Sequence, residues 1–187
     1  MRSARSFRFT DEFRSFTGGN MTNEFVEDSK IQQIAEAYAL DTVDFAAKNF
    51  QISLDWSDSS VAYVEKILGI FHDQAATAKP SEDQVFQFAK LFGSYVGEVF
   101  RRNHGAAWGM VSLQGQTFQG LKADGSAGLF WPWGRAQQRL IGGAENNIWD
   151  YYQVLLERNG SNVTNPPQPS SPRSQQSWRG KLFGSKR

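Results

Sequence analysis

The sequence predicts a single α+β domain, in which a helical hairpin and further helices pack on a small antiparallel sheet of about three to four strands. Two segments carry apolar residues at helical spacing and are joined by a short link that contains Pro80. After Gly105 the pattern becomes strand-like, with turn residues at 123–126. Matched helical stripes followed by short strands are typical of α+β domains.

The predicted domain covers residues 23–158 and begins with a long helix at 23–49. One stripe of this helix is apolar and contains Ile31, Ile34, Tyr38 and Phe45. Residues 50–54 then alternate between apolar and polar side chains, which predicts a short strand. The polar residues 55–60 supply candidates for the N-cap of the next helix.

The helical hairpin is predicted from two matched stripes on either side of Pro80. The second helix places apolar residues at 3-4 spacing, at Val61, Val64, Leu68, Phe71 and Ala75. A third helix repeats this spacing, at Val85, Phe88, Phe92, Tyr95 and Val99. Ser81 and Gln84 have the spacing of a capping box. Because the third helix also carries apolar residues off its stripe, including Phe86 and Phe100, we expect it to be the central element.

The sheet is predicted from three short segments after the third helix, at 108–113, 117–121 and 129–131. Asp124 and Gly125 tolerate positive φ and therefore indicate a hairpin turn. Pro132 ends the third strand, a short helix starts near 134, and a last helix is predicted at 145–158.

Composition excludes several classes of site. The chain has no cysteine, so disulfides, thiolate metal sites and cysteine nucleophiles are excluded. His72 and His104 are the two histidines and lack metal-ligand spacing, and no dinucleotide or phosphate-binding motif is present. We therefore expect no metal and no cofactor. No sequence motif identifies a catalytic residue. With no membrane span or secretory signal in the sequence, we expect a cytoplasmic protein.

The charge is divided along the chain. Residues 1–20 carry a net +2 and residues 159–187 a net +5, which leaves −6 for residues 21–158. An acidic domain argues against nucleic-acid binding by the folded part. The same charge favours a basic protein partner, although many soluble proteins share it.

The two ends of the chain, residues 1–22 and 159–187, are predicted to be disordered and basic. The first repeats Arg-Ser-Phe and is interpreted either as an aromatic segment that docks somewhere or as sequence upstream of a start at Met21. The second is rich in Pro and Ser, a composition that buries too little to fold. It ends in a candidate linear docking motif that contains Trp178, Leu182 and Phe183.

The third helix holds one candidate site. Gly93 and Gly97 share a face, and the groove they leave favours close packing of the sheet or the first helix, with a bound ligand or partner as the alternative. Glu98 and Arg102 have i,i+4 spacing and predict an ion pair beside Tyr95 and Trp108. A catalytic role for Glu98 is the less favoured interpretation, since no cleft is evident from the sequence.

A second candidate site surrounds the Trp-Pro-Trp motif. Two tryptophans on either side of a proline cannot both point the same way from one strand, so we expect one to be exposed. Exposed tryptophans often anchor protein interfaces. The candidate partner-binding residues at this place are Trp131, Trp133, Arg135, Arg139 and Glu145. A rim that simply closes the core is the competing interpretation.

The order of these motifs resembles a family of small bacterial domains of unknown function. The residues that carry the resemblance are Leu54-Asp55-Trp56-Ser57, Gly93-x-Tyr95-x-Gly97-Glu98-Val99, Arg102, Trp108, Phe130-x-Pro132, Arg139-Leu140 and Gly143. The sequence departs from the family pattern at Gln138, Ile141 and Asn147-Ile148. The resemblance implies a bacterial α+β domain with no assigned activity, and by analogy with proteins of this size an immunity partner of a toxin.

Three functional hypotheses follow. The first is a non-enzymatic protein-binding domain, such as an immunity or adaptor protein that recognises a basic partner. The second is an enzyme of unknown reaction that uses Glu98 with Arg102 or Arg139. The third is a scaffold that acts through its C-terminal motif. The oligomeric state is not predicted from the sequence.

Overall fold

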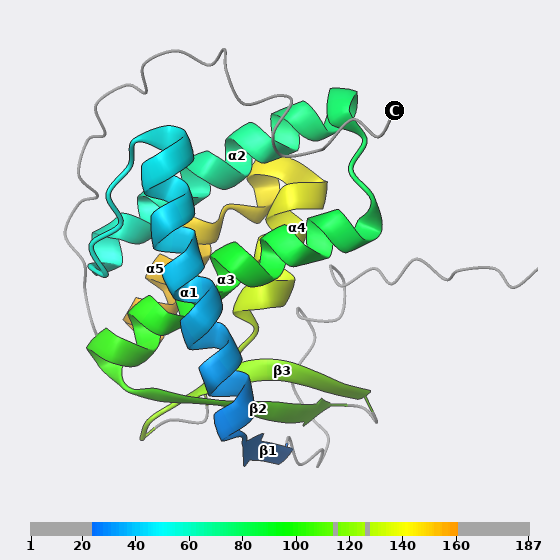
Figure 1. The fold of residues 1–187 in the computed structure, drawn as a ribbon. Coiled ribbons are helices and arrows are strands. Elements are labelled where there is room, and N and C mark those ends of the chain that lie inside the picture. The colour runs from blue at the N-terminus through cyan, green and yellow to red at the C-terminus, as the bar shows by residue number, and fades with distance from the viewer. Residues whose placement is uncertain (1–23, 114–115, 126–127, 161–187) are drawn as a thin grey trace, which may run out of the picture.

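Five helices pack on one side of a four-stranded antiparallel sheet (Figure 1), so the predicted α+β class is confirmed. This computed structural model describes residues 24–113, 116–125 and 128–160. The helices are α1 (Ser29–Phe50), α2 (Val61–Ala78), α3 (Glu82–His104), α4 (Pro132–Gly142) and α5 (Ile148–Arg158). Two short 3₁₀ helices, η2 (Asp58–Ser60) and η3 (Gly143–Asn146), precede α2 and α5.

The sheet has the strand order β1-β2-β3-β4, and each neighbouring pair is antiparallel. Its strands are β1 (Glu24–Glu27), β2 (Ala106–Leu113), β3 (Gln116–Ala123) and β4 (Leu129–Phe130). Gly125 has φ 65° in the turn after β3, as its place in the predicted hairpin requires.

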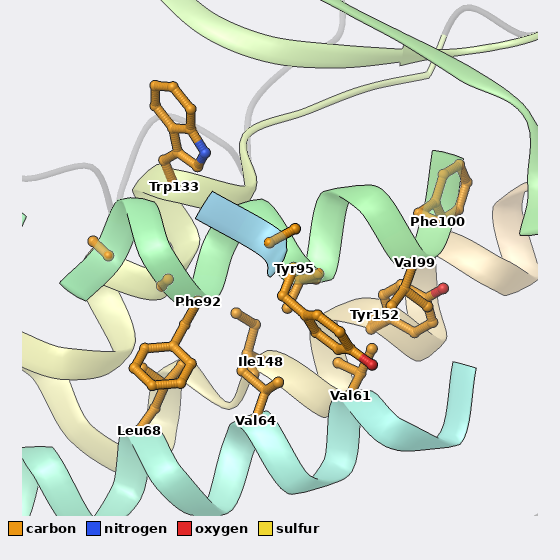
Figure 2. Packing of buried hydrophobic residues seen from close by; sticks show 14 of the residues in the cluster. Val61, Val64, Leu68, Phe92, Tyr95, Val99, Phe100, Trp133, Ile148 and Tyr152 are labelled. Atoms are coloured by element: carbon orange, nitrogen blue, oxygen red, sulfur yellow. The ribbon is translucent and has the colours of Figure 1, made fainter. Parts of the chain in front are cut away.

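Helix α3 is the central element, as expected. The capping box at its start is present, with the Ser81 hydroxyl accepting from the Gln84 amide and the Gln84 side chain accepting from the Ser81 amide. Every residue from Phe92 to Phe100 is buried. Figure 2 shows large side chains of α2 and α3 facing each other, among them Val64, Leu68, Phe92 and Tyr95. The two helices therefore form the predicted hairpin, with a thick apolar layer between their backbones.

The start of the domain differs from the prediction, because Glu24–Glu27 form strand β1 rather than the first turn of a helix. β1 pairs with β2, and the Asp28 amide donates to the Trp108 carbonyl at 3.0 Å. The Asp28 carboxylate then accepts from the Lys30 amide and caps α1. The N-cap therefore fixes where the helix begins, and pairing with β2 determines the conformation before it.

The apolar stripe of α1 is only partly buried. Ile31 belongs to the core and Phe45 packs against it, whereas Ile34 is 47% exposed. The fully buried residues of the helix are Ala35, Ala39, Thr42 and Ala46. These small side chains let the backbones of α1 and α3 come close, and the Thr42 hydroxyl donates to the Leu91 carbonyl at 2.7 Å. Close backbone approach favours alanine over isoleucine at the contact, which the apolar periodicity alone does not reveal.

The predicted strand at 50–54 is wrong. Phe50 ends α1, and Gln51 caps the helix in the left-handed conformation at φ 57°. The Ile52 amide then donates back to the Ala46 carbonyl. The apolar alternation arises because Leu54 is buried and Ile52 packs against the core while the backbone runs as a loop.

The Trp-Pro-Trp motif begins a helix instead of ending a strand. β4 stops at Phe130, Trp131 is the N-cap of α4, and Pro132 occupies its first turn. Proline suits this position because its missing N–H would have had no helical partner. The predicted last helix is divided, with η3 first and α5 starting at Ile148 after the side-chain cap of Asn147.

Candidate functional site: a groove beside helix α1

The two glycines of α3 are covered from within the domain. A Cβ on Gly97 would lie 2.4 Å from Trp108 Cζ2 and 2.9 Å from Leu121 Cδ1, so the sheet packs here, as predicted. A Cβ on Gly93 would lie 2.6 Å from the Pro132 carbonyl oxygen. The neighbour at Gly93 is therefore the start of α4 rather than α1. Both glycines are used for internal packing.

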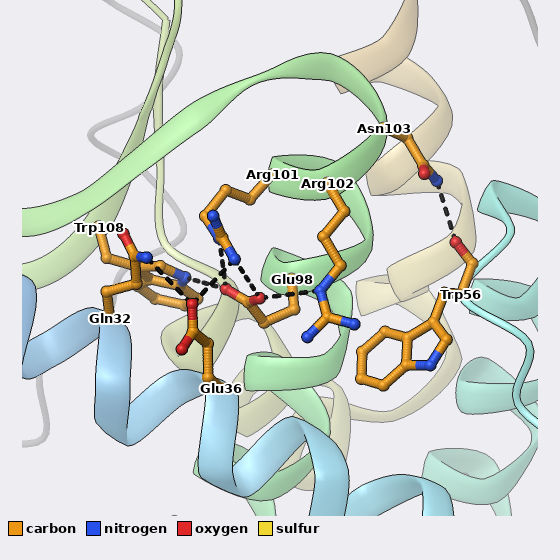
Figure 3. Close-up of polar contacts among 8 residues, drawn as sticks. All are labelled: Gln32, Glu36, Trp56, Glu98, Arg101, Arg102, Asn103 and Trp108. Carbon is orange, nitrogen blue, oxygen red and sulfur yellow. Dashed lines mark hydrogen bonds and ion pairs between the residues drawn. The ribbon is translucent and has the colours of Figure 1, made fainter.

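Glu98 lies at the centre of a buried polar cluster (Figure 3) and is 0% exposed. Its carboxylate accepts from Arg101 at both oxygens, each at 2.9 Å, and from Arg102 Nε at 3.1 Å. Trp108 Nε1 donates to it at 2.8 Å. Arg101 continues to Glu36 of α1, also at 2.9 Å. The cluster thus ties α3 to α1 and to β2, and four hydrogen bonds occupy the carboxylate.

Tyr95 belongs to an adjoining cluster around Trp56, which has φ 65°. The Tyr95 hydroxyl accepts from the Trp56 amide at 3.0 Å and shares a hydrogen bond with Ser60 at 2.7 Å. The Arg102 guanidinium lies 3.8 Å from the Trp56 ring centroid. A bulky residue at positive φ requires such support. The Asp-Trp-Ser segment is therefore held against α3 by Tyr95 and Arg102.

Asp58 joins three elements and was not identified from the sequence. It accepts from Tyr152 of α5, from Asn103 at 3.1 Å and from His104 Nε2, which lies 2.9 Å from its Oδ1. His104, the last residue of α3, pairs with this carboxylate. His72 contacts the Leu140 carbonyl at 2.9 Å. Within the described ranges, no cluster of His, Asp and Glu is arranged to hold a metal ion.

The candidate residues around the Trp-Pro-Trp motif are largely structural. Trp133 is 8% exposed, and its indole N–H donates to Ser94 at 2.8 Å. Trp131 is half-buried. Arg135 lies over the Tyr151 ring at 4.9 Å, whereas Glu145 is exposed.

Arg139 pairs with Glu65 of α2 rather than with Glu98. Arg139 Nε lies 2.7 Å from Glu65 Oε1, and the second Glu65 oxygen accepts from the Ile148 amide at the start of α5. A Cβ on Gly69 would lie 2.8 Å from Arg139 Nη2, so this glycine makes room for the guanidinium. The pair joins three helices. Trp178, Leu182 and Phe183, the remaining candidates, lie outside the described residues.

An open groove of about 600 Å³ lies beside α1, along part of the apolar stripe identified in the sequence. We call it the α1–α3 groove. It is lined by Ile31, Ile34, Ala37, Tyr38 and Asp41 of α1, Phe86 and Lys90 of α3, Gln119 of β3 and Trp133 of α4.

The exposed apolar side chains of the α1–α3 groove are Ile34 at 47% and Phe86 at 41%. Lys90 Nζ lies 5.2 Å from the Tyr38 ring centroid and 5.1 Å from that of Phe86. Tyr38 donates a hydrogen bond to Gln87 of α3, which fixes its ring on this wall. The groove therefore presents aromatic and aliphatic side chains that are held in place by α1 and α3.

Acidic side chains border this apolar surface. Asp41 lines the groove, and Glu82 and Asp83 are exposed one turn before Phe86. Lys90, the one basic residue in the lining, already lies over two aromatic rings. An apolar ligand with basic flanks would meet both the rings and the carboxylates.

The sequence contained a signal for this groove that apolar periodicity obscured. Ala35, Ala39, Thr42 and Ala46 have helical spacing of their own and continue the buried position of Ile31. Ile34 and Tyr38 lie on a neighbouring face, which is left over after the helix packs through the small residues. Phe86 was expected to be buried with the other apolar residues of the third helix, but it is 41% exposed.

Comparisons with protein-family models, with curated proteins and with solved structures found no match to this chain. None of the helices in the described part of the chain has the length and apolar character needed to cross a membrane.

Proposed function

We propose that this chain is a non-enzymatic protein-binding domain that holds an apolar, basic segment of another protein in the α1–α3 groove. The supporting observation is the exposure of Ile34 and Phe86 on the two walls of this groove. Exposed apolar residues that are contiguous and rimmed by charge are typical of interaction sites.

The shape of the groove favours a short helical or extended segment as the bound element. Its walls are two helices, with Gln119 and Trp133 contributing to the lining from the sheet and α4. An amphipathic segment places its apolar side chains in such a groove and leaves its polar face in water. A partner aromatic residue in contact with Ile34 and Phe86 would bury area on both exposed side chains, which makes this position the expected hot spot.

Charge supports a basic partner. The predicted domain carries a net −6, and Asp41, Glu82 and Asp83 lie in or beside the groove. Complementary charge speeds encounter and disfavours acidic competitors. A protein that neutralises or recruits a basic partner, such as an immunity or adaptor protein, would use a surface of this kind.

Neither alternative has a specific observation in its favour. An enzyme that uses Glu98 would need the carboxylate to reach a substrate, and this carboxylate is buried with four hydrogen bonds. A scaffold that acts through Trp178, Leu182 and Phe183 would depend on residues outside the described part of the chain.

The proposal is tested by capturing proteins from the source cell on four forms of the chain. These are the wild type, Phe86→Asp, Ile141→Asp and a chain that ends at Asn159. Ile141 is 64% exposed on α4 and does not line the groove, so Ile141→Asp is the matched control. We expect the wild type, Ile141→Asp and the shortened chain to retain the same partner, and Phe86→Asp to lose it.

Each form must first be shown to fold, by circular dichroism and thermal unfolding. A partner that binds Phe86→Asp as well as the wild type would refute the groove as its site. Loss of the partner only from the chain ending at Asn159 would instead assign recognition to the C-terminal segment.

A further inference from the structure

The sheet has a second face, turned away from the helices, that also carries aromatic side chains. Trp108, Met110 and Leu121 contact the helical core, so the alternate residues of β2 and β3 point to the opposite side. On that side Val111 of β2 is paired with Phe25 of β1 and Phe118 of β3, which gives one cross-strand row. We call this side the outer face.

Two glycines leave room for aromatic rings on the outer face. A Cβ on Gly109 would lie 2.8 Å from Phe25 Cζ, and a Cβ on Gly120 would lie 3.3 Å from Trp131 Cδ1. The ring of Phe25 thus lies against β2, and that of Trp131 against β3. Aromatic side chains gathered in this way suit contact with further apolar groups.

Val111 is 0% exposed although it does not belong to the helical core cluster. The described helices lie on the other side of the sheet (Figure 1). The side chains around Val111 are less well buried, because Phe25, Phe118 and Trp131 each keep partial contact with water. The outer face therefore offers apolar surface that a further segment could cover.

We propose that residues 5–16 of the same molecule cover the outer face. This segment contains Phe7, Phe9, Phe13 and Phe16, and it leads directly into β1 at the edge of the sheet. Gly18 and Gly19 supply the freedom for a reversal between Phe16 and Glu24.

Chain length is sufficient for this arrangement. The residues between Phe16 and Glu24 can span up to roughly 25 Å when extended. Neighbouring strands lie about 4.8 Å apart, so crossing from β1 to β4 requires about 14 Å. The C-terminal segment is attached at the end of α5, whose contacts are with helices. Attachment therefore favours the N-terminal segment as the cover.

The absence of cysteine allows a direct test on the full chain. Ser15→Cys introduces a single thiol for a nitroxide spin label, and Ser171→Cys in the C-terminal segment is the matched control. We expect the label at position 15 to broaden the methyl signals of Val111 more than those of Leu68, which lies in the helical core. The label at position 171 should leave the Val111 signals sharp.

Two results of this experiment would overturn the proposal. One is equal broadening of Val111 and Leu68 by the label at position 15. The other is broadening of Val111 that appears only when labelled and isotope-enriched copies are mixed, because the cover would then be a second copy of the chain.

A second measurement does not depend on the label. A chain that starts at Met21 should unfold at a lower urea concentration than the full chain, and Phe13→Ala should move the midpoint in the same direction. Ser171→Ala is the control and should leave the midpoint unchanged. An unchanged midpoint for both the shortened chain and Phe13→Ala would contradict the proposal. Neither result depends on partner binding in the α1–α3 groove, so the two proposals can fail separately.

Discussion

Gly97 of α3 has no room for a side chain, because the indole of Trp108 lies 2.4 Å from where a Cβ would be. Gly97→Ala would force the indole or the helix to move. We expect the free energy of unfolding to fall by about 1–3 kcal/mol, the range for overpacked cores. Gly134 of α4 is exposed, and a Cβ there would make only an ordinary contact, 3.9 Å from Trp131 Cβ, so Gly134→Ala should leave stability unchanged or raise it by up to about 1 kcal/mol. Urea unfolding measures the free energy of unfolding of both variants. Equal changes in the two variants would contradict the packing described for Gly97.

Glu98 has a structural role that substitution can separate from a catalytic one. Glu98→Gln removes the charge that Arg101 and Arg102 share and turns an amide N–H toward the donors around it. We expect a loss of about 2 kcal/mol, below the usual range for breaking a buried ion pair because both guanidinium groups keep contact with water. Glu157→Gln, at an exposed position of α5, is the control for thermal unfolding. Unchanged stability of Glu98→Gln would reopen the enzymatic hypothesis.

Helix α1 contacts α3 closely through its alanine side chains, whereas Ile34 lies on its exposed surface. Ala39→Leu should overpack the contact with α3 and reduce the free energy of unfolding by about 1–3 kcal/mol. Ile34→Ala should cost less than about 1 kcal/mol, since Ile34 is nearly half exposed. Chemical unfolding of the two variants compares the faces directly. The reverse order of effects would mean that the apolar stripe, and not the alanine stripe, packs on α3.

Helices α3 and α5 each contribute a buried tyrosine hydroxyl to the polar network. Burial raises the pKa of both Tyr95 and Tyr152 above the usual value of about 10. The folded protein therefore keeps protons that the unfolded chain loses, so this contribution to stability is complete below about pH 10 and is lost as the pH rises further.

This predicts alkaline unfolding, with phenolate absorbance appearing together with the loss of helical circular dichroism. Tyr152→Phe should make stability above about pH 10 less dependent on pH than in the wild type. Constant or increasing stability through this range would show that the two hydroxyls are accessible in the folded state.

The elements that the sequence predicted well have strong local signals. The capping box of Ser81 and Gln84 and the regular stripe of α3 lie within a few residues of one another, as do Asp124 and Gly125 in the turn. Strand β1 has no such signal, because it is held by pairing with residues more than 80 positions away. The pairing of Arg139 with Glu65 is separated by 74 positions and cannot be inferred from helical spacing.

The candidate site was predicted only in part for the same reason. Sequence spacing identified the pair of Glu98 and Arg102 and the close packing at Gly97. The α1–α3 groove depends on which face of α1 packs on α3, and the small residues Ala35, Ala39 and Thr42 provide that face while Ile34 stays exposed. The Trp-Pro-Trp motif was assigned to a strand, so Trp133 was not expected on the wall of a helix-lined groove.

The whole molecule is organised around α3, with α1, α2, α4 and the sheet each packed on a different part of it (Figures 1 and 2). This arrangement buries the glycine face, Glu98 and the large aromatic residues. The apolar stripe of Ile34 and Tyr38 is left beside Phe86 at the surface. The proposed function is based on these exposed side chains. The packing of the core does not explain why they lie at the surface.

The central claim is that the α1–α3 groove serves recognition and not stability. Titration calorimetry of the captured partner against the wild type, Phe86→Asp and Ile141→Asp tests it, with urea unfolding of the same samples. We predict that Phe86→Asp binds at least about tenfold more weakly, a loss of about 1.4 kcal/mol, and unfolds within about 0.5 kcal/mol of the wild type. Ile141→Asp should match the wild type in both measurements. Undiminished affinity of a folded Phe86→Asp would contradict the account.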